Sequence, residues 1–233
     1  MSAVKDREVL IPGGTGGLGV HVTAAFVHAG ARVTVPVFSS DELASLRAVL
    51  GDRADDVRLV DADLRDESQV KRLADGMPHI DALVHLVGGF AMGDTASFEL
   101  DALRHQLELN VVTAFATIKH ALRRMRERDY GRIVTVASRA AEDPPARLAA
   151  YAAAKAGVLA LTRSVADETR GTDITANCVL ASVIDTPANR AAMGADQVHR
   201  WVAPTNLAEH ILHLADDAAG SLRGTALRVY ADA

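Results

Sequence analysis

The sequence has very little cysteine and few aromatic residues. Cys178 is the only cysteine among 233 residues, so the chain can form no internal disulfide and no cysteine-based zinc cluster. It lies in the apolar run TANCVLA, which predicts a buried, unreactive thiol. Aromatic residues make up 4% of the chain and hydrophobic residues 49%, so we expect a large core built from alanine, valine, leucine and isoleucine.

Long apolar segments and an excess of positive charge are also missing. No run approaches the roughly 20 apolar residues of a membrane span, and the first residues lack the apolar stretch of a signal peptide. The net charge of −5 argues against a nucleic-acid-binding face. The histidines are scattered and suggest no metal site. We therefore expect a cytoplasmic protein that binds neither nucleic acid, membrane nor metal.

Short apolar runs alternate with longer amphipathic segments along the whole chain. Strands are expected at residues 8–12, 31–37, 57–64, 80–89, 131–138, 173–180 and 224–231. Helices are expected at residues 16–30, 40–50, 66–76, 98–128, 148–170 and 204–216. This alternation predicts an α/β fold: one Rossmann-type domain over residues 1–233, with a doubly wound parallel sheet of about seven strands and helices on both faces.

A glycine-rich loop follows the first expected strand and leads into a helix. Glycine lets the backbone turn sharply and approach a pyrophosphate, and the N-terminus of the next helix offers unpaired N–H groups to the phosphates. In this position the loop indicates a dinucleotide site, although a tight turn without a ligand is the alternative. The cofactor-binding residues expected here are Gly13, Thr15, Gly16, Gly17, Leu18 and Gly19.

The end of the second expected strand carries no charged residue before Asp41. NAD enzymes often place an acid here for the ribose hydroxyls, whereas an arginine nearby accommodates the 2′-phosphate of NADP. We expect Phe38 and Ser39 to contact the cofactor. The missing carboxylate favours NADP(H) over NAD(H), and the sequence leaves both open. Arg32 and Arg47 are candidates to reach a 2′-phosphate.

Asp63 and Leu64 close the third expected strand. An aspartate at the carboxyl end of a strand can accept a hydrogen bond from the adenine amino group, so we expect both residues to contact the cofactor. The alternative role for Asp63 is to cap the next helix, but Asp66 is better placed for that.

Tyr151 and Lys155 lie four residues apart in a long expected helix, so their side chains share one face. A free tyrosine has a pKa of about 10, too high for proton exchange near neutral pH. A neighbouring ammonium group stabilises the phenolate and lowers that pKa. Ser138 ends the fifth expected strand, at the sheet edge where ligands bind in such folds. Its hydroxyl is placed to hold a substrate oxygen beside Tyr151.

The whole chain resembles the short-chain dehydrogenase/reductases. The resemblance rests on the glycine loop, the turn at residues 85–88, Asn110 in the long helix, Ser138, and the pair Tyr151 and Lys155. The gaps from the serine to the tyrosine and on to the lysine are those that the family uses.

The resemblance implies an NAD(P)-dependent oxidoreductase that acts on a ketone, a 3-oxoacyl thioester or a secondary alcohol. It implies that Tyr151 exchanges a proton with the substrate oxygen, which Ser138 polarises. Lys155 then lowers the tyrosine pKa and holds the nicotinamide ribose, and Asn110 holds a water that links Lys155 to solvent. Further cofactor contacts are implied at Val87, Gly88, Ile184 (through its backbone) and Thr186.

Three turns depart from the family pattern. Pro12 replaces a threonine whose hydroxyl ties the glycine loop to the turn after the fourth strand, and His85 replaces the first asparagine of that turn. After the sixth strand, Ala181 and Ser182 replace the usual Pro-Gly. These changes leave a nucleotide-sensing or scaffold protein with little turnover as an alternative, which the complete set of catalytic residues opposes.

Residues 186–204 correspond to the family's substrate lid. The lid residues expected to form an apolar cover or to meet an anion are Met193, Trp201, Val202, Arg190 and Arg200. The alternative is a lid fragment or interface loop that makes only packing contacts. The lid, together with residues 88–90, also resembles dihydropteridine reductases, so a pteridine reductase is a further alternative. Ser138, which those enzymes generally lack, favours ordinary carbonyl chemistry.

The family usually assembles as dimers or tetramers through its fourth and fifth helices. The alanine-rich residues 148–162 would allow close helix packing, so we expect a homodimer or homotetramer.

Overall fold

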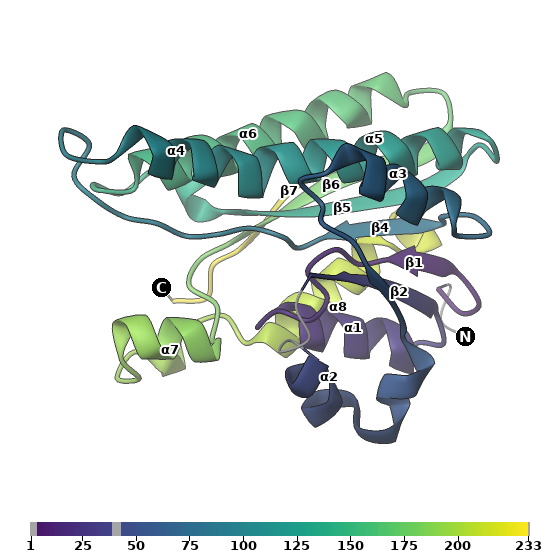
Figure 1. The fold of residues 1–233 in the computed structure, drawn as a ribbon, viewed down its shortest axis with the longest axis horizontal. Coiled ribbons are helices and arrows are strands. Elements are labelled where there is room, and N and C mark those ends of the chain that lie inside the picture. The colour runs from purple at the N-terminus through teal and green to yellow at the C-terminus, as the bar shows by residue number, and fades with distance from the viewer. Residues whose placement is uncertain (1–3, 39–42, 233) are drawn as a thin grey trace.

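Seven parallel strands form a single sheet in the order β3-β2-β1-β4-β5-β6-β7 (Figure 1). The computed structural model describes residues 4–38 and 43–232. The strands are β1 Glu8–Leu10, β2 Arg32–Val37, β3 Arg58–Asp61, β4 Ala82–His85, β5 Tyr130–Ser138, β6 Asp173–Ala181 and β7 Ala226–Val229. The chain order reverses between β1 and β4, which is where ligands bind in open α/β sheets. The predicted Rossmann-type fold is therefore confirmed.

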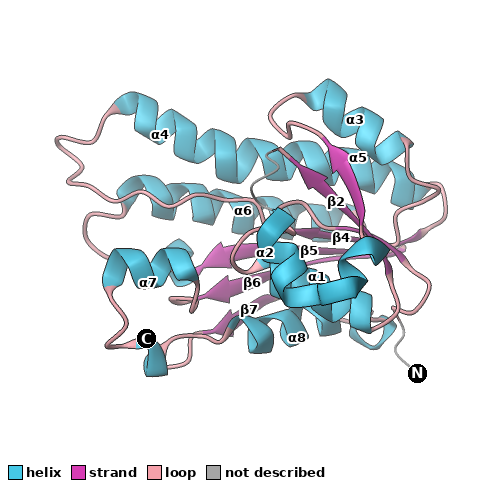
Figure 2. Cartoon of the chain, turned by 60° about the horizontal axis from the view of Figure 1, so that its bottom comes forward, coloured by secondary structure: helices cyan, strands magenta, loops and turns pink. Residues whose placement is uncertain are grey.

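Helices cover both faces of this sheet (Figures 1 and 2). They are α1 Gly19–His28, α2 Leu43–Leu50, α3 Glu67–Asp75, α4 Leu100–Leu107, α5 Thr113–Arg126, α6 Ala149–Glu168, α7 Pro187–Met193 and α8 Pro204–Leu214. Helices α1, α2 and α8 lie on one face, and α3 to α6 lie on the other (Figure 1). None of the helices described is long and apolar enough to cross a lipid bilayer.

The central strands are buried on both faces because their side chains alternate between two cores. Val9 and Val84 point into the core shared with α1 and α8, whereas Leu10 and Leu83 point into the core under α3 and α5. As the composition predicts, these cores consist mainly of aliphatic side chains. Cys178 is fully buried at the middle of β6, as expected.

The long helix expected at residues 98–128 is interrupted. A π-helical turn, Glu108–Val112, separates α4 from α5. Such turns insert one residue into the helical hydrogen-bond ladder and often occur at functional sites. Asn110 lies within this turn and is fully buried. The interruption leaves no mark in the hydrophobic periodicity of the segment, so the sequence did not reveal it.

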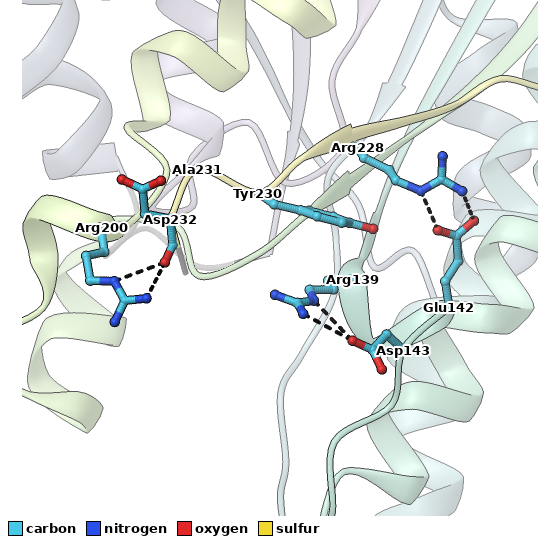
Figure 3. Close-up of a pocket in the computed structure, with 8 residues that line it drawn as sticks. All are labelled: Arg139, Glu142, Asp143, Arg200, Arg228, Tyr230, Ala231 and Asp232. Carbon is cyan, nitrogen blue, oxygen red and sulfur yellow. Dashed lines mark hydrogen bonds and ion pairs between the residues drawn. The ribbon is translucent and has the colours of Figure 1, made fainter.

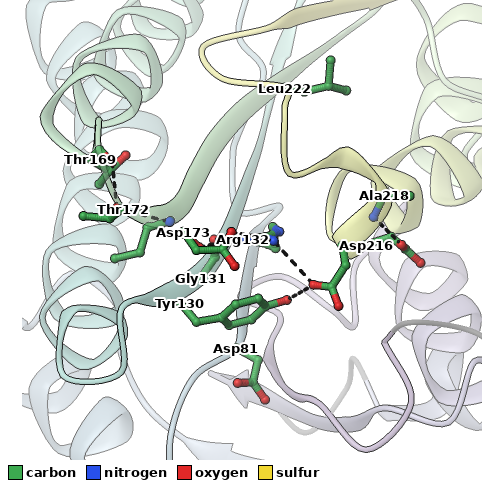
Figure 4. A network of polar contacts seen from close by, with 12 residues as sticks. Asp81, Tyr130, Gly131, Arg132, Thr169, Thr172, Asp173, Asp216, Ala218 and Leu222 are labelled. Atoms are coloured by element: carbon green, nitrogen blue, oxygen red, sulfur yellow. Dashed lines mark hydrogen bonds and ion pairs between the residues drawn. The ribbon is translucent and has the colours of Figure 1, made fainter.

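A network of polar side chains lies at the amino edge of the sheet (Figure 4). Arg132 on β5 is 2% exposed, lies 3.0 Å from the Asp173 carboxylate and 3.4 Å from that of Asp217. The Tyr130 hydroxyl donates to Asp217 at 2.7 Å. These contacts join β5 to β6 and to the segment after α8, and they leave the opposite, carboxyl edge available for function.

Candidate active site

The glycine loop lies against the turn that follows β4. Gly13 has a φ of +78°, and a Cβ on it would lie 2.9 Å from the Val87 amide nitrogen. Only glycine satisfies both the left-handed backbone and this close approach. Helix α1 begins at Gly19, later than expected, so Gly16, Gly17 and Leu18 belong to the loop.

A cavity of about 350 Å³ lies at this edge of the sheet, between the loop and the ends of β2, β3 and β4. The predicted cofactor residues that line it are Gly13, Thr15, Gly16, Phe38, Asp63, Leu64, Val87 and Gly88. The other predicted cofactor residues are not among its lining residues: Gly17, Leu18, Gly19, Tyr151, Lys155, Ile184 and Thr186. Ser39 lies outside the described residues. The prediction of Asp66 as a helix cap is correct, because its carboxylate accepts from the Ser68 amide at 2.8 Å.

Ser138 and Tyr151 come together at the carboxyl end of β5. Ser138 is the last residue of β5, and Tyr151 lies in the first turn of α6. Burial raises the pKa of Tyr151, and a hydrogen bond with Ser138 offsets part of that rise. Lys155 does not contribute to this shift, so the pKa of Tyr151 lies above its usual value and not below it. The hydroxyl groups of Ser138 and Tyr151 nevertheless lie next to each other.

Lys155 lies one helical turn beyond Tyr151 and is buried. Its ammonium group lies 5.9 Å from the centre of the Tyr151 ring and donates to the Val136 carbonyl at 3.2 Å. Burial lowers its pKa to about 8. At neutral pH the ammonium form therefore predominates, while a neutral amine is accessible within about one pH unit.

Asn110 approaches Lys155 from the π-helical turn. Its side-chain NH2 group donates to the carbonyls of Gln106 at 2.9 Å and Gly89 at 3.2 Å. Its buried Oδ1 has no hydrogen-bond partner within the described part of the chain. A Cβ on Gly88 would lie 2.6 Å from this oxygen and 2.8 Å from Lys155 Nζ. The backbone at Gly88 thus lies close to both polar groups. Because a buried oxygen is normally hydrogen-bonded, Asn110 Oδ1 is expected to accept a bond from a further donor.

A family model described as short chain dehydrogenase matches residues 7–196. The chain belongs to the short-chain dehydrogenase family. It is 30% identical to the uncharacterized oxidoreductase YvrD of Bacillus subtilis, over 97% of this chain and 95% of that protein. It is 33% identical to cis-4-hydroxycyclohexanecarboxylate dehydrogenase of Sinomonas cyclohexanicum, over 97% and 96%.

Solved structures agree with this assignment. A short-chain type dehydrogenase/reductase from Mycobacterium ulcerans has a TM-score of 0.90 at 26% identity, with 99% of this chain and 90% of that chain covered. Levodione reductase has a TM-score of 0.88 at 26% identity, with 97% and 96% covered. The chain is thus an oxidoreductase of a family that acts on alcohol and ketone substrates with nicotinamide cofactors.

Two departures from the short-chain dehydrogenase pattern have structural compensation. The Leu86 amide donates to the Pro12 carbonyl at 2.9 Å, a main-chain bond that connects the glycine loop to the β4 turn whichever side chain stands at position 12. His85 is buried, with Nδ1 2.9 Å from Thr117 Oγ1 and Nε2 3.4 Å from Thr113 Oγ1. Burial lowers the pKa of His85 to about 3, so the ring is neutral and connects β4 to α5.

The third departure also has a defined contact. Ser182, which follows β6, donates through its hydroxyl to the Tyr230 carbonyl at 2.5 Å, and its amide donates to the Val229 carbonyl at 3.2 Å. These bonds fix the turn after β6 to the chain beyond β7. The turn therefore keeps a defined position without the family's Pro-Gly.

The lid begins beside the glycine loop. A Cβ on Gly17 would lie 3.1 Å from Thr186 Cβ, and the Thr186 hydroxyl caps α7 by accepting from the Asn189 amide at 3.2 Å. The Ile184 carbonyl accepts from the Asn189 side chain at 2.8 Å. Thr186 and Ile184 thus lie near the loop, although the Thr186 hydroxyl and the Ile184 carbonyl already accept hydrogen bonds within the chain.

The other lid residues mostly follow the alternative expectation, in which the lid makes only packing contacts. Trp201 and Val202 are buried, and Val202 is part of the core beside α8, so neither forms a surface cover. Arg190 makes a bidentate pair with Asp185. Arg200 donates to the Asp232 carbonyl in a separate charged cavity of about 560 Å³ (Figure 3). Of the three apolar lid residues, only Met193 is exposed. Contacts with distant parts of the chain account for the burial of Trp201 and Val202.

The two arginines considered for a 2′-phosphate also differ from expectation. Arg32 begins β2, at the amino edge of the sheet, and pairs with Glu8 at 2.6 Å and with Asp6 at 3.7 Å. It is therefore at the wrong end of the strand for the cofactor cavity, which lies at the carboxyl edge. Arg47 is exposed on α2 and does not line the cavity.

Two residues near the site were missed by the sequence analysis. Phe90 meets the Tyr151 ring edge-on, with 5.0 Å between the ring centres, and remains 61% exposed. Arg65 lines the cofactor cavity. Both follow strand ends by a few residues, in loops whose path cannot be read from periodicity.

Proposed function

We propose that this chain catalyses reversible hydride transfer between NADP(H) and the reacting carbon of a ketone or secondary alcohol, with Tyr151 as the proton donor and acceptor. The observation that carries the proposal is the meeting of Ser138 and Tyr151 beside buried Lys155, at the edge of the sheet that holds the glycine-loop cavity. In this proposal, residues 1–233 form a single domain that both binds the cofactor and carries out catalysis.

The cavity residues fit a nicotinamide dinucleotide. Gly13 and Gly16 bring the backbone of the loop to the cavity wall, where its N–H groups can bind a pyrophosphate. Asp63 and Leu64 lie where an adenine would contact the end of β3. Gly88 lets the backbone at the cavity wall pass close to Asn110 and Lys155, and the ammonium group there is placed to hold the hydroxyls of a ribose. The bound cofactor supplies or accepts the hydride.

The four polar residues divide the proton chemistry among them. In the reducing direction Tyr151 gives its proton to the carbonyl oxygen, and Ser138 donates a hydrogen bond to the same oxygen. The resulting phenolate is stabilised by the Lys155 ammonium group, which matters most because burial disfavours that anion. The unsatisfied oxygen of Asn110 is placed to accept a hydrogen bond from a water molecule, and that water would pass protons between Lys155 and solvent.

The substrate side offers an apolar surface. Phe90 exposes most of its ring next to Tyr151, and Met193 at the end of α7 is 58% exposed. These side chains favour an apolar group next to the reacting carbon. Assembly as a homodimer or homotetramer is also proposed, since Leu107, Val112 and Phe115 form exposed apolar positions along α4, the π-helical turn and α5.

The direct test is to mix the purified protein with NADPH and with NADH and then add a panel of neutral ketones and quinonoid dihydropterin. We expect nucleotide binding, followed by NADPH oxidation with at least one ketone. A fluorescence change on nucleotide binding without oxidation by any compound would contradict the proposal and support a nucleotide sensor. Turnover confined to the dihydropterin would support a pteridine reductase.

A further inference from the structure

Arg65 occupies a specific place in the wall of the cofactor cavity. Its guanidinium carbon lies 5.1 Å from the centre of the Phe38 ring. Its Nε and Nη2 donate to the two carboxylate oxygens of Asp63 at 2.9 and 2.8 Å, and its backbone amide donates to Oδ1 at 2.9 Å. One side chain thus connects the end of β2 to the end of β3 across the mouth of the cavity.

The arrangement is not explained by stability alone. The Arg65 side chain is 41% exposed and that of Asp63 is 26% exposed. Ion pairs so open to solvent contribute little to folding, because water screens both charges. The pair does, however, hold the guanidinium in a fixed orientation at the cavity. A fixed, planar cation with several N–H donors is well suited to bind a phosphate.

Arg65 is the only cation among the described residues that line this cavity. The end of β2 contributes Val37 and Phe38, and residues 39–42 read Ser-Ser-Asp-Glu, so this stretch of sequence has no basic residue. Arg32 lies at the opposite edge of the sheet. Among the described lining residues, Arg65 is therefore the cation available to a 2′-phosphate near Phe38.

We propose that Arg65 is the residue that selects NADP(H), binding the 2′-phosphate of the adenosine while Phe38 packs against the adenosine and Asp63 accepts from the adenine amino group. The Asp63–Arg65 pair holds both groups ready before the cofactor arrives. On binding, the guanidinium exchanges part of its contact with the carboxylate for the phosphate. This inference rests on the proposed function, because it concerns the cofactor of the same reaction.

The test compares the affinities of Arg65→Ala and Arg65→Lys for NADPH and NADH, measured from nucleotide fluorescence without substrate. Because a hydrogen-bonded charged contact is lost, we expect Arg65→Ala to weaken NADPH binding by roughly ten- to a hundred-fold and NADH binding by about two-fold or less. Arg65→Lys keeps the charge without the planar fork, so it should retain part of the preference.

Arg104→Ala is the matched control. Arg104 is an exposed arginine on α4 that pairs with Asp101 at 2.6 Å and does not line the cavity. We expect this variant to bind both nucleotides as the unaltered protein does. Salt gives a second readout: raising the ionic strength should weaken NADPH binding more than NADH binding, and Arg65→Ala should remove that difference.

The outcomes separate the two proposals. If neither nucleotide binds the unaltered protein, the proposed function fails. If both bind but Arg65→Ala weakens them equally, or leaves NADPH binding unchanged, only the role of Arg65 is overturned. Tighter binding of NADH than of NADPH by the unaltered protein would also overturn it.

Discussion

The ammonium group of Lys155 lies 5.9 Å from the centre of the Tyr151 ring, one turn further along α6. Both side chains are removed from water, and burial moves their pKa values in opposite directions, that of Tyr151 up and that of Lys155 down to about 8. Each shift disfavours a charged form. Without a bound ligand, the protein therefore favours the neutral forms of both groups.

Replacement of Tyr151 by phenylalanine should remove the proton donor and leave the cavity intact. We expect turnover to fall by roughly 10²- to 10⁴-fold, the usual contribution of general acid–base catalysis. Nucleotide binding should persist, because the ring and Lys155 remain. Steady-state kinetics and nucleotide fluorescence measure the two effects.

Tyr230→Phe is the control for this prediction, since Tyr230 lines the separate charged cavity (Figure 3). It should leave turnover within about two-fold of the unaltered enzyme, a change of less than 0.5 kcal/mol. Equal turnover in the Tyr151→Phe variant and the unaltered protein would remove Tyr151 from its proposed role.

The buried ammonium group of Lys155, which the proposed reaction needs, should lower the stability of the folded protein. Its folded pKa of about 8 lies below its usual value of 10.5, so the folded protein binds fewer protons than the unfolded chain between these two pH values. The cost is complete below pH 8, and stability is recovered as the pH rises from about 8 towards 10.5. We expect Lys155→Met to be about 1–3 kcal/mol more stable at pH 7 and almost inactive.

Chemical denaturation of both proteins at pH 7 and at pH 10 checks this sign. The stability gain of the methionine variant should shrink at the higher pH. A gain that is the same at both pH values would show that packing, not ionisation, is responsible.

Gly88 should tolerate no side chain. A Cβ there would meet Asn110 Oδ1 at 2.6 Å and Lys155 Nζ at 2.8 Å, so Gly88→Ala must displace both of these proposed catalytic groups. We expect turnover to fall at least about 100-fold, because small misplacements at a reacting site have effects of that size. Steady-state kinetics at a temperature well below unfolding provides the measurement.

Gly171→Ala serves for comparison. Gly171 has a φ of +83°, and a Cβ on it would meet nothing within 4 Å. The strained backbone should cost roughly 1 kcal/mol of stability, with turnover preserved. Similar activity losses in both variants would point to general destabilisation instead of a local clash at Gly88.

Arg132 should matter for folding and not for catalysis. It is 2% exposed and contacts Asp173 and Asp217 at the amino edge of the sheet (Figure 4). Arg132→Ala removes a buried side chain that bonds the Gly131 and Asp173 carbonyls, whereas the carboxylates of Asp173 and Asp217 are about half exposed and can be rehydrated, so we expect a loss of about 1–3 kcal/mol. Thermal unfolding should report this loss, while KM and kcat at low temperature remain near those of the unaltered enzyme. A changed KM with unchanged stability would contradict this separation.

The sequence by itself determined the fold class, the glycine loop and the positions of the catalytic groups along the chain. These features depend on local order: strand and helix periods, the conformational freedom of Gly13, and the four-residue spacing that places Tyr151 and Lys155 on one face of α6. Such signals survive in a single sequence because each is complete within one element or turn.

Only the tertiary structure decided what those groups experience. Burial raised the pKa of Tyr151 against expectation, and the π-helical turn brought Asn110 to Gly88. Long-range packing buried Trp201 and directed Arg200 to the chain end, while Arg65 reached Phe38 from another strand. Desolvation and contacts between distant segments depend on neighbours far apart in the chain, and no local pattern encodes them.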